Sequence, residues 1–371
     1  MRLSDVDSLE LPATADMHVH LRQGDMMKFV VPTIRKGGVD TVFVMPNLTP
    51  PITSVARALE YKAELEAIDP SVNYLMSLFL HPDVTPEVIA EAAKAGIAGV
   101  KLYPQGVTTN SENGVSAIEE YFPVFAAMEE HDIVLNLHGE AVKSPAVGVS
   151  LEEAFLPMLT KIHEAHPKLR IVLEHCSTKA AVAAVRSCGP TVSGKYSSSA
   201  SLMQDSATIT AHHLFLTGAH SLENPHAFCK PIPKTPEDRD ALLQAVVSGD
   251  TKFFFGSDSA PHSLVSKTNS QAPPAGVFTQ IFATQYVLLA LEDATRLNVI
   301  DPKDVTQERL EQFLSLSGRK FYKLPHDAAS IPKIALTRRG SKIPERISNE
   351  DDSLKIGLVR AGNPILSLSW V

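Results

Sequence analysis

Eight continuously apolar, β-branched runs recur along the chain and alternate with helical patterns. The runs lie at residues 15–21, 40–46, 72–80, 97–103, 133–139, 170–176, 207–216 and 251–258. Their lack of polar alternation is typical of strands that are buried on both faces of a parallel sheet. Helical patterns lie at residues 54–68, 86–96, 116–131, 150–166, 177–189, 236–249, 278–297 and 307–321. This order predicts the α/β class and a (β/α)8 TIM barrel.

The whole chain, residues 1–371, is expected to form a single domain. This length is long for an ordinary domain but normal for a barrel of this kind, which folds as one unit. We place the barrel at about 13–322 and expect 323–371 to be a short C-terminal extension that packs on it. A polar, proline-containing loop, Ser263–Ala275, follows the eighth run.

The composition argues against several classes of protein. Apolar residues make up 44% of the chain and charged residues 20%, as in globular proteins with a large core. The net charge of −8, without a long basic run, argues against a nucleic-acid surface. No run approaches the about 18 apolar residues of a membrane span, and the first residues lack a signal-peptide core. Three cysteines without C-x-x-C spacing favour a reduced, cytoplasmic protein.

The first apolar run contains the stretch ADMHVHLRQ, in which two histidines lie two residues apart. Side chains with this spacing share one face of a strand, so His18 and His20 are expected to lie side by side, with Arg22 next in the row. Two neutral imidazoles on one face can share a metal ion. The pattern alone also fits two polar residues on a half-buried strand, so the rest of the chain must decide.

Active-site residues of such barrels lie at the C-terminal ends of the strands. Several of the apolar runs, including the first, have polar residues at or just after this end: His18, His20, Arg22, Asn47, Lys101, His138, His175, Asp258 and His262. Each one alone has an ordinary explanation, such as a hydrogen-bonded core histidine or a lysine that reaches solvent. Their convergence on one mouth of the barrel predicts a metal site.

Lys101 is the informative residue of this set, because an ammonium group repels a cation and cannot be a ligand. A lysine in a low-dielectric site loses its proton readily. The neutral amine can then add CO2 to form a carbamate, whose two oxygens can bridge two metal ions. Imidazole and carboxylate ligands suit Zn2+, and hydrolytic sites with two metals hold the ions ~3.5–4 Å apart.

This set of residues resembles the binuclear site of the amidohydrolase superfamily. The flanking sequences are similar to those of the single-function dihydroorotases of bacteria and fungi, from about Asp16 to about Tyr322. The similar stretches are DMHVHLRQGDM, VMPNLTPPITS, KLYPQGVTTNS, LHGE, LEHCSTK and GSDSAPH. The resemblance implies de novo pyrimidine (UMP) biosynthesis, in which N-carbamoyl-L-aspartate is closed reversibly to L-dihydroorotate.

The resemblance implies two Zn2+ ions per chain. His18, His20 and Asp258 hold one ion. His138 and His175 hold the other. The lysine at position 101, modified to N6-carboxylysine, bridges the two ions together with a hydroxide. Asp258 also shuttles the proton between the hydroxide and the ring nitrogen.

The resemblance also implies a substrate pocket. Arg22, Asn47 and His262 are expected to bind the substrate carboxylate. Lys230 is expected to contact the pyrimidine ring through its backbone, and Ala275 to lie near the substrate. Thr108 and Thr109 belong to a loop, Gln105–Gly114, that is expected to close over the substrate.

Three alternatives stay open at this point. Dihydropyrimidinases or hydantoinases act on related cyclic amides, but their substrates lack the ring carboxylate that Arg22, Asn47 and His262 are expected to bind. Metal-dependent phosphoesterases also use H-x-H on a first strand but do not need Lys101. A catalytically inactive barrel could serve as an assembly scaffold, although this chain keeps all six candidate ligands. We expect a small-molecule substrate as partner, no nucleic acid, no membrane, and a homodimer.

Overall fold

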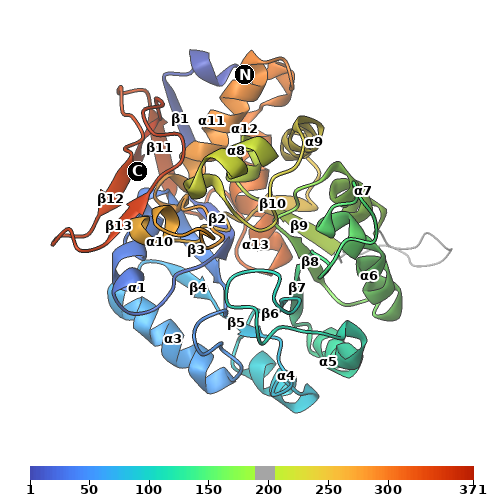
Figure 1. Cartoon of the computed structure of the whole chain (residues 1–371). Coiled ribbons are helices and arrows are strands. Elements are labelled where there is room, and N and C mark those ends of the chain that lie inside the picture. The colour runs from blue at the N-terminus through green and yellow to red at the C-terminus, as the bar shows by residue number, and fades with distance from the viewer. Residues whose placement is uncertain (189–204) are drawn as a thin grey trace.

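The computed structural model describes residues 1–188 and 205–371 and confirms the predicted α/β barrel (Figure 1). Within these residues, parallel strands form two sheets, with the orders β2-β3-β4 and β5-β6-β7-β8-β9-β10. The strands are β2 (Thr14–Val19), β3 (Val39–Val44), β4 (Asn73–Leu75), β5 (Ser77–Phe79), β6 (Gly99–Leu102), β7 (Val134–His138), β8 (Ile171–Glu174), β9 (Asp205–Ile209) and β10 (Phe253–Phe255). They are buried almost throughout, as their continuous apolarity predicts.

Backbone hydrogen bonds join the two sheets into a closed barrel. At one seam, the run predicted at 72–80 divides at Met76 into β4 and β5, and the carbonyl of Met76 accepts from the amide of Ala98 at 2.9 Å. At the other seam, the amide of Asp258 donates to the carbonyl of His18 at 2.8 Å. This second seam brings the ends of β2 and β10 together, and with them two of the candidate metal ligands.

Helices surround the barrel, as Figure 1 shows. Those that follow predicted helical patterns are α3 (Val55–Ile68), α4 (Pro86–Lys94), α5 (Phe122–His131), α6 (Leu151–Ala165), α7 (Lys179–Ser187), α9 (Pro236–Val246), α11 (Ala283–Arg296), α12 (Gln307–Glu311) and α13 (Ser317–Phe321). Shorter helices are α1 (Gly24–Val30), α2 (Thr33–Lys36), α8 (Gly218–Glu223) and α10 (Leu264–Thr268). None of the helices in the described ranges is long and apolar enough to cross a membrane.

Some predicted element boundaries are wrong. The seventh run was expected to be a strand to residue 216, but β9 ends at Ile209 and His212–Leu214 forms a 3-10 turn. Leu214 and Leu216 are apolar because they are buried in the core, which the sequence cannot distinguish from burial in a strand. The helix predicted at 177–189 ends at Ser187, and its last predicted residue lies outside the described residues.

One end of the barrel is filled with apolar side chains. Helices α12 and α13, joined by a π-helical turn, lie against the strand beginnings, where Ser315 Oγ donates to the carbonyl of Ala13 at 2.8 Å. Phe321 and Tyr322 pack there with Phe43 and Phe254 in one buried cluster. This floor leaves the C-terminal ends of the strands as the open end of the barrel.

The C-terminal segment forms a small antiparallel sheet with the N-terminal strand. Strand β11 (Lys333–Thr337) lies between β1 (Ser8–Pro12) and β14 (Ser367–Trp370), and β12 (Arg346–Ser348) pairs with β13 (Lys355–Gly357). Trp370 Nε1 donates to the carbonyl of Arg35 at 3.0 Å, and the Arg35 guanidinium lies 3.2 Å from the centre of the indole. The sequence analysis did not predict that β1 belongs to this sheet.

Candidate metal-dependent active site

Most of the candidate site residues line one cavity at the C-terminal ends of the barrel strands. These residues are His18, His20, Arg22, Asn47, Thr108, Thr109, His138, His175, Lys230, Asp258 and Ala275. Tyr103, Ala260 and Gly276 complete the lining. The side chain of Lys101 is fully buried nearby, and His262 contacts Arg22 and Ala275 at the rim. The structure therefore brings all the predicted site residues into one neighbourhood.

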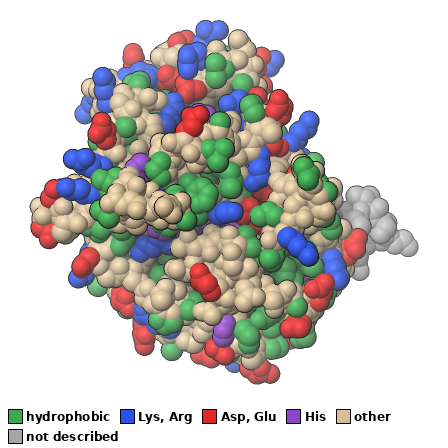
Figure 2. Space-filling model, viewed as in Figure 1, with side chains coloured by type: hydrophobic (Ala, Val, Ile, Leu, Met, Phe, Trp, Pro, Cys, Tyr) green, Lys and Arg blue, Asp and Glu red, His purple; other side chains and the backbone are tan. Residues whose placement is uncertain are grey.

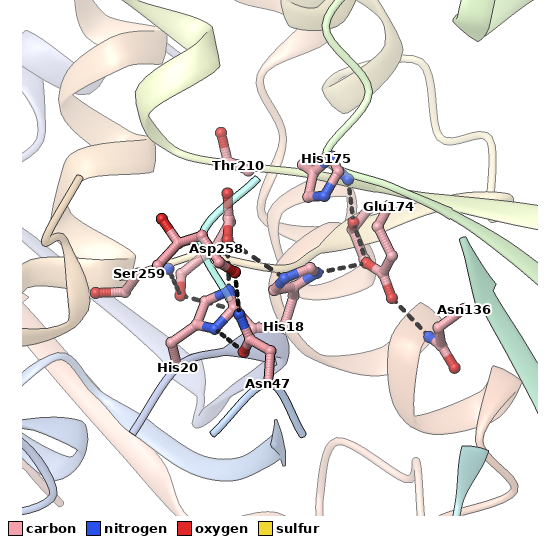
Figure 3. A network of polar contacts seen from close by, with 12 residues as sticks. His18, His20, Asn47, Asn136, Glu174, His175, Thr210, Asp258 and Ser259 are labelled. Atoms are coloured by element: carbon pink, nitrogen blue, oxygen red, sulfur yellow. Dashed lines mark hydrogen bonds and ion pairs between the residues drawn. The ribbon is translucent and has the colours of Figure 1, made fainter. Parts of the chain in front are cut away.

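His18, His20 and Asp258 form the tightest group of potential ligands. The Nε2 atoms of His18 and His20 lie 3.3 Å and 3.1 Å from the same carboxylate oxygen, Oδ1 of Asp258 (Figure 3). One ligand atom from each residue lies within 4.8 Å of the others. Three buried side chains that direct nitrogen and oxygen atoms at one point form a suitable arrangement for a divalent cation.

The outer nitrogen atoms of these imidazoles are held by other side chains. Nδ1 of His18 lies 2.9 Å from Oε2 of Glu174, and Nδ1 of His20 lies 2.8 Å from Oδ1 of Asn47. Nε2 of His138 lies 3.0 Å from Oε2 of Glu140. A carboxylate or amide oxygen on one nitrogen fixes the tautomer and orients the other nitrogen toward a metal.

Lys101 and His175 contain buried nitrogen atoms without partners. Within the described part of the chain, Lys101 Nζ and His175 Nδ1 make no hydrogen bond, although both residues are buried. The imidazole rings of His138 and His175 are 4.7 Å apart between centres, and those of His18 and His175 are 5.1 Å apart. Native structures rarely leave such groups unpaired, so these nitrogens indicate a missing ligand.

The protonation states of these residues suit metal binding. Burial lowers the pKa of Lys101 to about 8 and that of His20 to about 4. Burial also holds the pKa of His175 well below its usual range. Burial raises the pKa of Asp258, but His18 and His20 outweigh this effect, and the net pKa lies well below the usual range. Burial also lowers the pKa of His18, but the charges of Glu174 and Asp258 outweigh this effect, so that its pKa is instead raised. The neutral imidazoles of His20 and His175, an ionised carboxylate and an amine that deprotonates readily fit a pair of zinc ions bridged by a lysine carbamate.

The backbone is strained where it presents three of these side chains. Arg22, His175 and Asp258 have φ angles of 60°, 44° and 45°, in the left-handed region that non-glycine residues rarely adopt. A Cβ at Gly256 would lie 2.7 Å from Thr208 and 3.0 Å from His18 Cβ, so only glycine fits there. Such strain is typical of functional sites.

Arg22 lines the cavity, and His262 lies next to it. Arg22 Nε donates to the carbonyl of Pro261 at 3.1 Å. His262 Nε2 lies 2.8 Å from the carbonyl oxygen of Ala275 and 3.2 Å from an Arg22 terminal nitrogen. A carbonyl can only accept, so Nε2 donates to Ala275 and cannot also accept from Arg22. The terminal nitrogens of Arg22 are therefore left to bind an anion.

The loop 105–114 lies over the cavity and is tied to it by single hydrogen bonds. Asn47 Nδ2 donates to the carbonyl of Thr109 at 3.0 Å, and Thr109 Oγ1 donates to the carbonyl of Ala275 at 3.2 Å. Lys267 supports the opposite wall, because its buried Nζ donates to the carbonyls of Phe228, Pro274 and Gly276 at 3.0, 2.9 and 2.7 Å.

The sequence analysis missed three residues that support the site. Glu174 directly precedes His175 in the stretch LEHC, and an acidic residue in a buried apolar strand is a usable signal. Glu140 follows His138 in LHGE and is also buried. Lys267 lies in α10, within the segment 263–275 that was predicted to be a polar loop, and it carries no such signal, because its three partners are backbone carbonyls.

The barrel, with its strand-end imidazoles and buried lysine, has the architecture of a metal-dependent hydrolase. A family model described as "Amidohydrolase" matches residues 65–264, and the protein is an amidohydrolase.

Proteins with similar sequences narrow this class. A chain of Schizosaccharomyces pombe named "Probable dihydroorotase" is 48% identical over 92% of this chain and 95% of its own length. A dihydroorotase of the bacterium Teredinibacter turnerae is 37% identical over 98% of each chain. The crystal structure of Saccharomyces cerevisiae dihydroorotase in complex with 5-fluoroorotic acid has a TM-score of 0.87 and 41% identity, covering 98% of this chain and 99% of that one. The chain belongs to the dihydroorotase family. This membership favours a dihydroorotase over a hydantoinase or an inactive scaffold.

Proposed function

We propose that this enzyme catalyses the reversible zinc-dependent cyclisation of N-carbamoyl-L-aspartate to L-dihydroorotate in de novo pyrimidine biosynthesis. The observation that carries this proposal is the position of Arg22, which lines the same cavity as His18, His20 and Asp258 and whose terminal nitrogens have no acceptor among the described residues. The cavity thus combines the donor set of a metal-dependent hydrolase with a site for a carboxylate. Its substrate is therefore a cyclic amide with an acidic group.

The proposed cofactor is a pair of Zn2+ ions, held by the four histidines and Asp258 and bridged by Lys101 as a carbamate. The full burial of Lys101, its unpaired Nζ and its lowered pKa of about 8 support this role. When bound, the two ions supply a hydroxide nucleophile near neutral pH and polarise the amide carbonyl.

Asp258 moves the proton in this proposal. In ring opening, its carboxylate accepts a proton from the attacking water and gives it to the ring nitrogen as the carbon–nitrogen bond breaks. In ring closure, the same carboxylate accepts the proton from the attacking nitrogen as the carbon–nitrogen bond forms and gives it to the oxygen that leaves as water. The contacts of Asp258 Oδ1 with His18 and His20 hold the carboxylate in place for both directions.

The substrate carboxylate binds to Arg22, Asn47 and His262 in this proposal. A guanidinium group binds a carboxylate through two parallel hydrogen bonds, which gives geometric selectivity as well as charge. Lys230 and Ala275 line the cavity and contact the ring through their backbone atoms. Thr108 and Thr109 close over the bound substrate and exclude water.

We also propose a cytoplasmic homodimer that acts on this small molecule without nucleic acid or membrane. The three cysteines, Cys176, Cys188 and Cys229, are all free and buried, which suits a reducing compartment. Figure 2 shows acidic and basic side chains interspersed on the visible face, without a continuous basic patch. Sedimentation of the purified protein tests the dimer.

The test of function is a direct assay of both directions, followed by ultraviolet absorbance of L-dihydroorotate. We expect turnover of N-carbamoyl-L-aspartate and L-dihydroorotate, and a much lower kcat/KM for dihydrouracil, which lacks the carboxylate. Equal turnover of dihydrouracil would contradict the assignment of an acid substrate. Absence of turnover by zinc-loaded enzyme would contradict the proposed function itself.

A further inference from the structure

A second group of metal-binding side chain types lies at the floor of the barrel, away from the active site. His163 is in the last turn of α6, Cys188 directly follows α7, and Asp205 is the first residue of β9. These three elements lie side by side in Figure 1. One ligand atom from each residue lies within 4.8 Å of the other two. No step of the proposed reaction uses any of them.

The polar atoms of this group face one another with few other partners. Nδ1 of His163 lies 2.7 Å from Oδ2 of Asp205, but the two atoms are not aligned as a hydrogen bond. Among residues 1–188 and 205–371, neither this nitrogen nor either carboxylate oxygen of Asp205 has a well-aligned hydrogen-bond partner, and Asp205 is only 1% exposed. Buried polar atoms without well-aligned hydrogen bonds are uncommon in native structures, and a bound cation would satisfy these.

Lys252 forms no ion pair with this carboxylate within the described residues. Its Nζ donates to the backbone carbonyls of Val185 and Cys188, at 2.9 Å and 2.5 Å. Burial raises the pKa of Asp205 to about 6 and that of Cys188 to about 12, although the charges of His163 and Lys252 partly offset the effect on Asp205. The thiol of Cys188 is therefore neutral until a metal ion displaces its proton.

We propose that Nδ1 of His163, Sγ of Cys188 and a carboxylate oxygen of Asp205 bind one zinc ion. Imidazole, thiolate and carboxylate are all zinc ligands, with bonds of about 2.0–2.3 Å. Tetrahedral bonds of this length place ligand atoms roughly 3.3–3.8 Å apart, so small side-chain shifts from the observed spacing would complete the site. Cys188 releases its thiol proton to solvent as the bond forms, and a water molecule takes the fourth position. The ion joins α6, α7 and β9.

Another group of similar composition does not support a metal site. His212, His213 and Cys229 also lie close together. However, both ring nitrogens of His213 already have partners, Thr210 Oγ1 at 2.8 Å and the carbonyl of Pro231 at 3.0 Å. This group therefore lacks a free second imidazole ligand, and it provides a control for the experiment.

Cobalt substitution tests the proposal, because Co2+ replaces zinc and a thiolate ligand gives it a charge-transfer absorption in the near ultraviolet. The candidate active site offers only nitrogen and oxygen ligands, so this band reports on a cysteine site alone. We expect the band in the cobalt-loaded wild-type enzyme and its loss in Cys188→Ser. The matched controls Cys176→Ser and Cys229→Ser should keep it.

Metal content measured on zinc-loaded protein gives a second readout. Asp205→Asn should bind one zinc ion fewer per chain than wild type, with the active-site metals and turnover unchanged. Asp205→Asn keeps the shape of the side chain, so it can test the site even if Cys188→Ser does not fold. The proposal is overturned if wild type shows no thiolate–cobalt band, or if the band survives Cys188→Ser or disappears in Cys229→Ser. Equal zinc content in Asp205→Asn and wild type would also overturn it.

Discussion

The two halves of the candidate active site are held in different ways. The metal-ligand half comes from residues at strand ends, and its imidazoles are fixed by side chains from other parts of the barrel, such as Glu174 of β8 behind His18 of β2. The substrate half comes from loops, and it is held by single hydrogen bonds to backbone carbonyls, such as that from Thr109 to Ala275. The metal-ligand half is therefore part of the barrel itself, whereas the substrate half consists of loops that are hydrogen-bonded to the barrel.

Because they are held differently, the two halves are expected to have different functions. Groups fixed by buried side-chain networks can keep ligand geometry through many turnovers. Loops joined by single hydrogen bonds of about 0.5–1.5 kcal/mol each can open for substrate and close again. Changes in the strand-borne half should therefore reduce metal content or chemistry, whereas changes in the loop-borne half should alter selectivity and closure with the metals retained.

The largest effect is expected from Lys101→Ala. Removal of the bridging ligand should lose most of the metal, so activity should fall by more than the ~10²–10⁴-fold that the loss of a general acid–base group causes. Short carboxylic acids should partly restore metal and activity, because they replace the carbamate. Metal analysis and the ring-closure assay measure both. A variant with two zinc ions and full activity would show that Lys101 does not bridge.

The second largest effect is expected from Asp258→Asn. Turnover should fall by at least ~10²-fold in both directions, because asparagine keeps the shape of the side chain but cannot carry the proton. Zinc content must be measured on the same preparation, since metal loss would give the same decrease. Near-normal turnover in either direction, with both metals bound, would mean that another group transfers the proton.

Arg22→Met tests the loop-borne half and should separate substrates. Loss of one partner of a buried charge pair costs about 2–5 kcal/mol, so kcat/KM for dihydroorotate should fall by roughly 30-fold or more. The rate with neutral dihydrouracil should change little, and zinc content should not change. Arg22→Lys keeps the charge without the two-pronged geometry and should still lose much of the activity. An equal decrease for both substrates would make Arg22 a structural residue.

Glu174→Gln should weaken metal binding by about 10–100-fold, the usual range for a residue that orients a metal-bound histidine. The matched control is Glu152→Gln, which alters another fully buried carboxylate that accepts from the amide of Ser177 at 2.8 Å. Competition with a chelator measures the affinity. If the two variants lose affinity equally, the contact of Glu174 with His18 has no special role.

The smallest effect is expected from the double variant Thr108→Ala with Thr109→Ala. Loss of two hydroxyl groups that contact substrate or hold the loop closed should reduce turnover by about 10-fold, at about 0.5–1.5 kcal/mol for each hydrogen bond. Zinc content should stay at the wild-type level. Thr268→Ala, which alters an exposed side chain, provides the control. Unchanged kinetics in the double variant would remove the loop from the mechanism.

The same division explains how much could be predicted from the sequence. The strands and the six candidate ligands follow from local patterns, because apolar runs define strands and strand ends define the mouth of the barrel. The orienting role of Glu174 depends on the closed barrel, which brings β8 and β2 into contact across its interior, although its place in a buried run was a signal. The contacts at Pro261 and Ala275 use backbone carbonyls, which leave no mark in residue type.

Two errors in the predicted fold have similar causes. The seventh strand was extended past Ile209 because buried loop residues such as Leu214 have the same apolar character as strand residues. The pairing of β1 with β11 joins residues more than 300 positions apart, and no local pattern encodes such a contact. Local chemistry was therefore predictable, and long-range pairing was not.

The most direct test of the central claim is a measurement of the proposed carbamate on Lys101. The zinc-loaded enzyme, equilibrated with 13C-labelled bicarbonate, should show one carbamate carbon resonance per chain by NMR. Lys101→Ala should lack this resonance and should have lost most of its metal. A fully active wild-type enzyme that binds two zinc ions and shows no carbamate resonance would contradict the account.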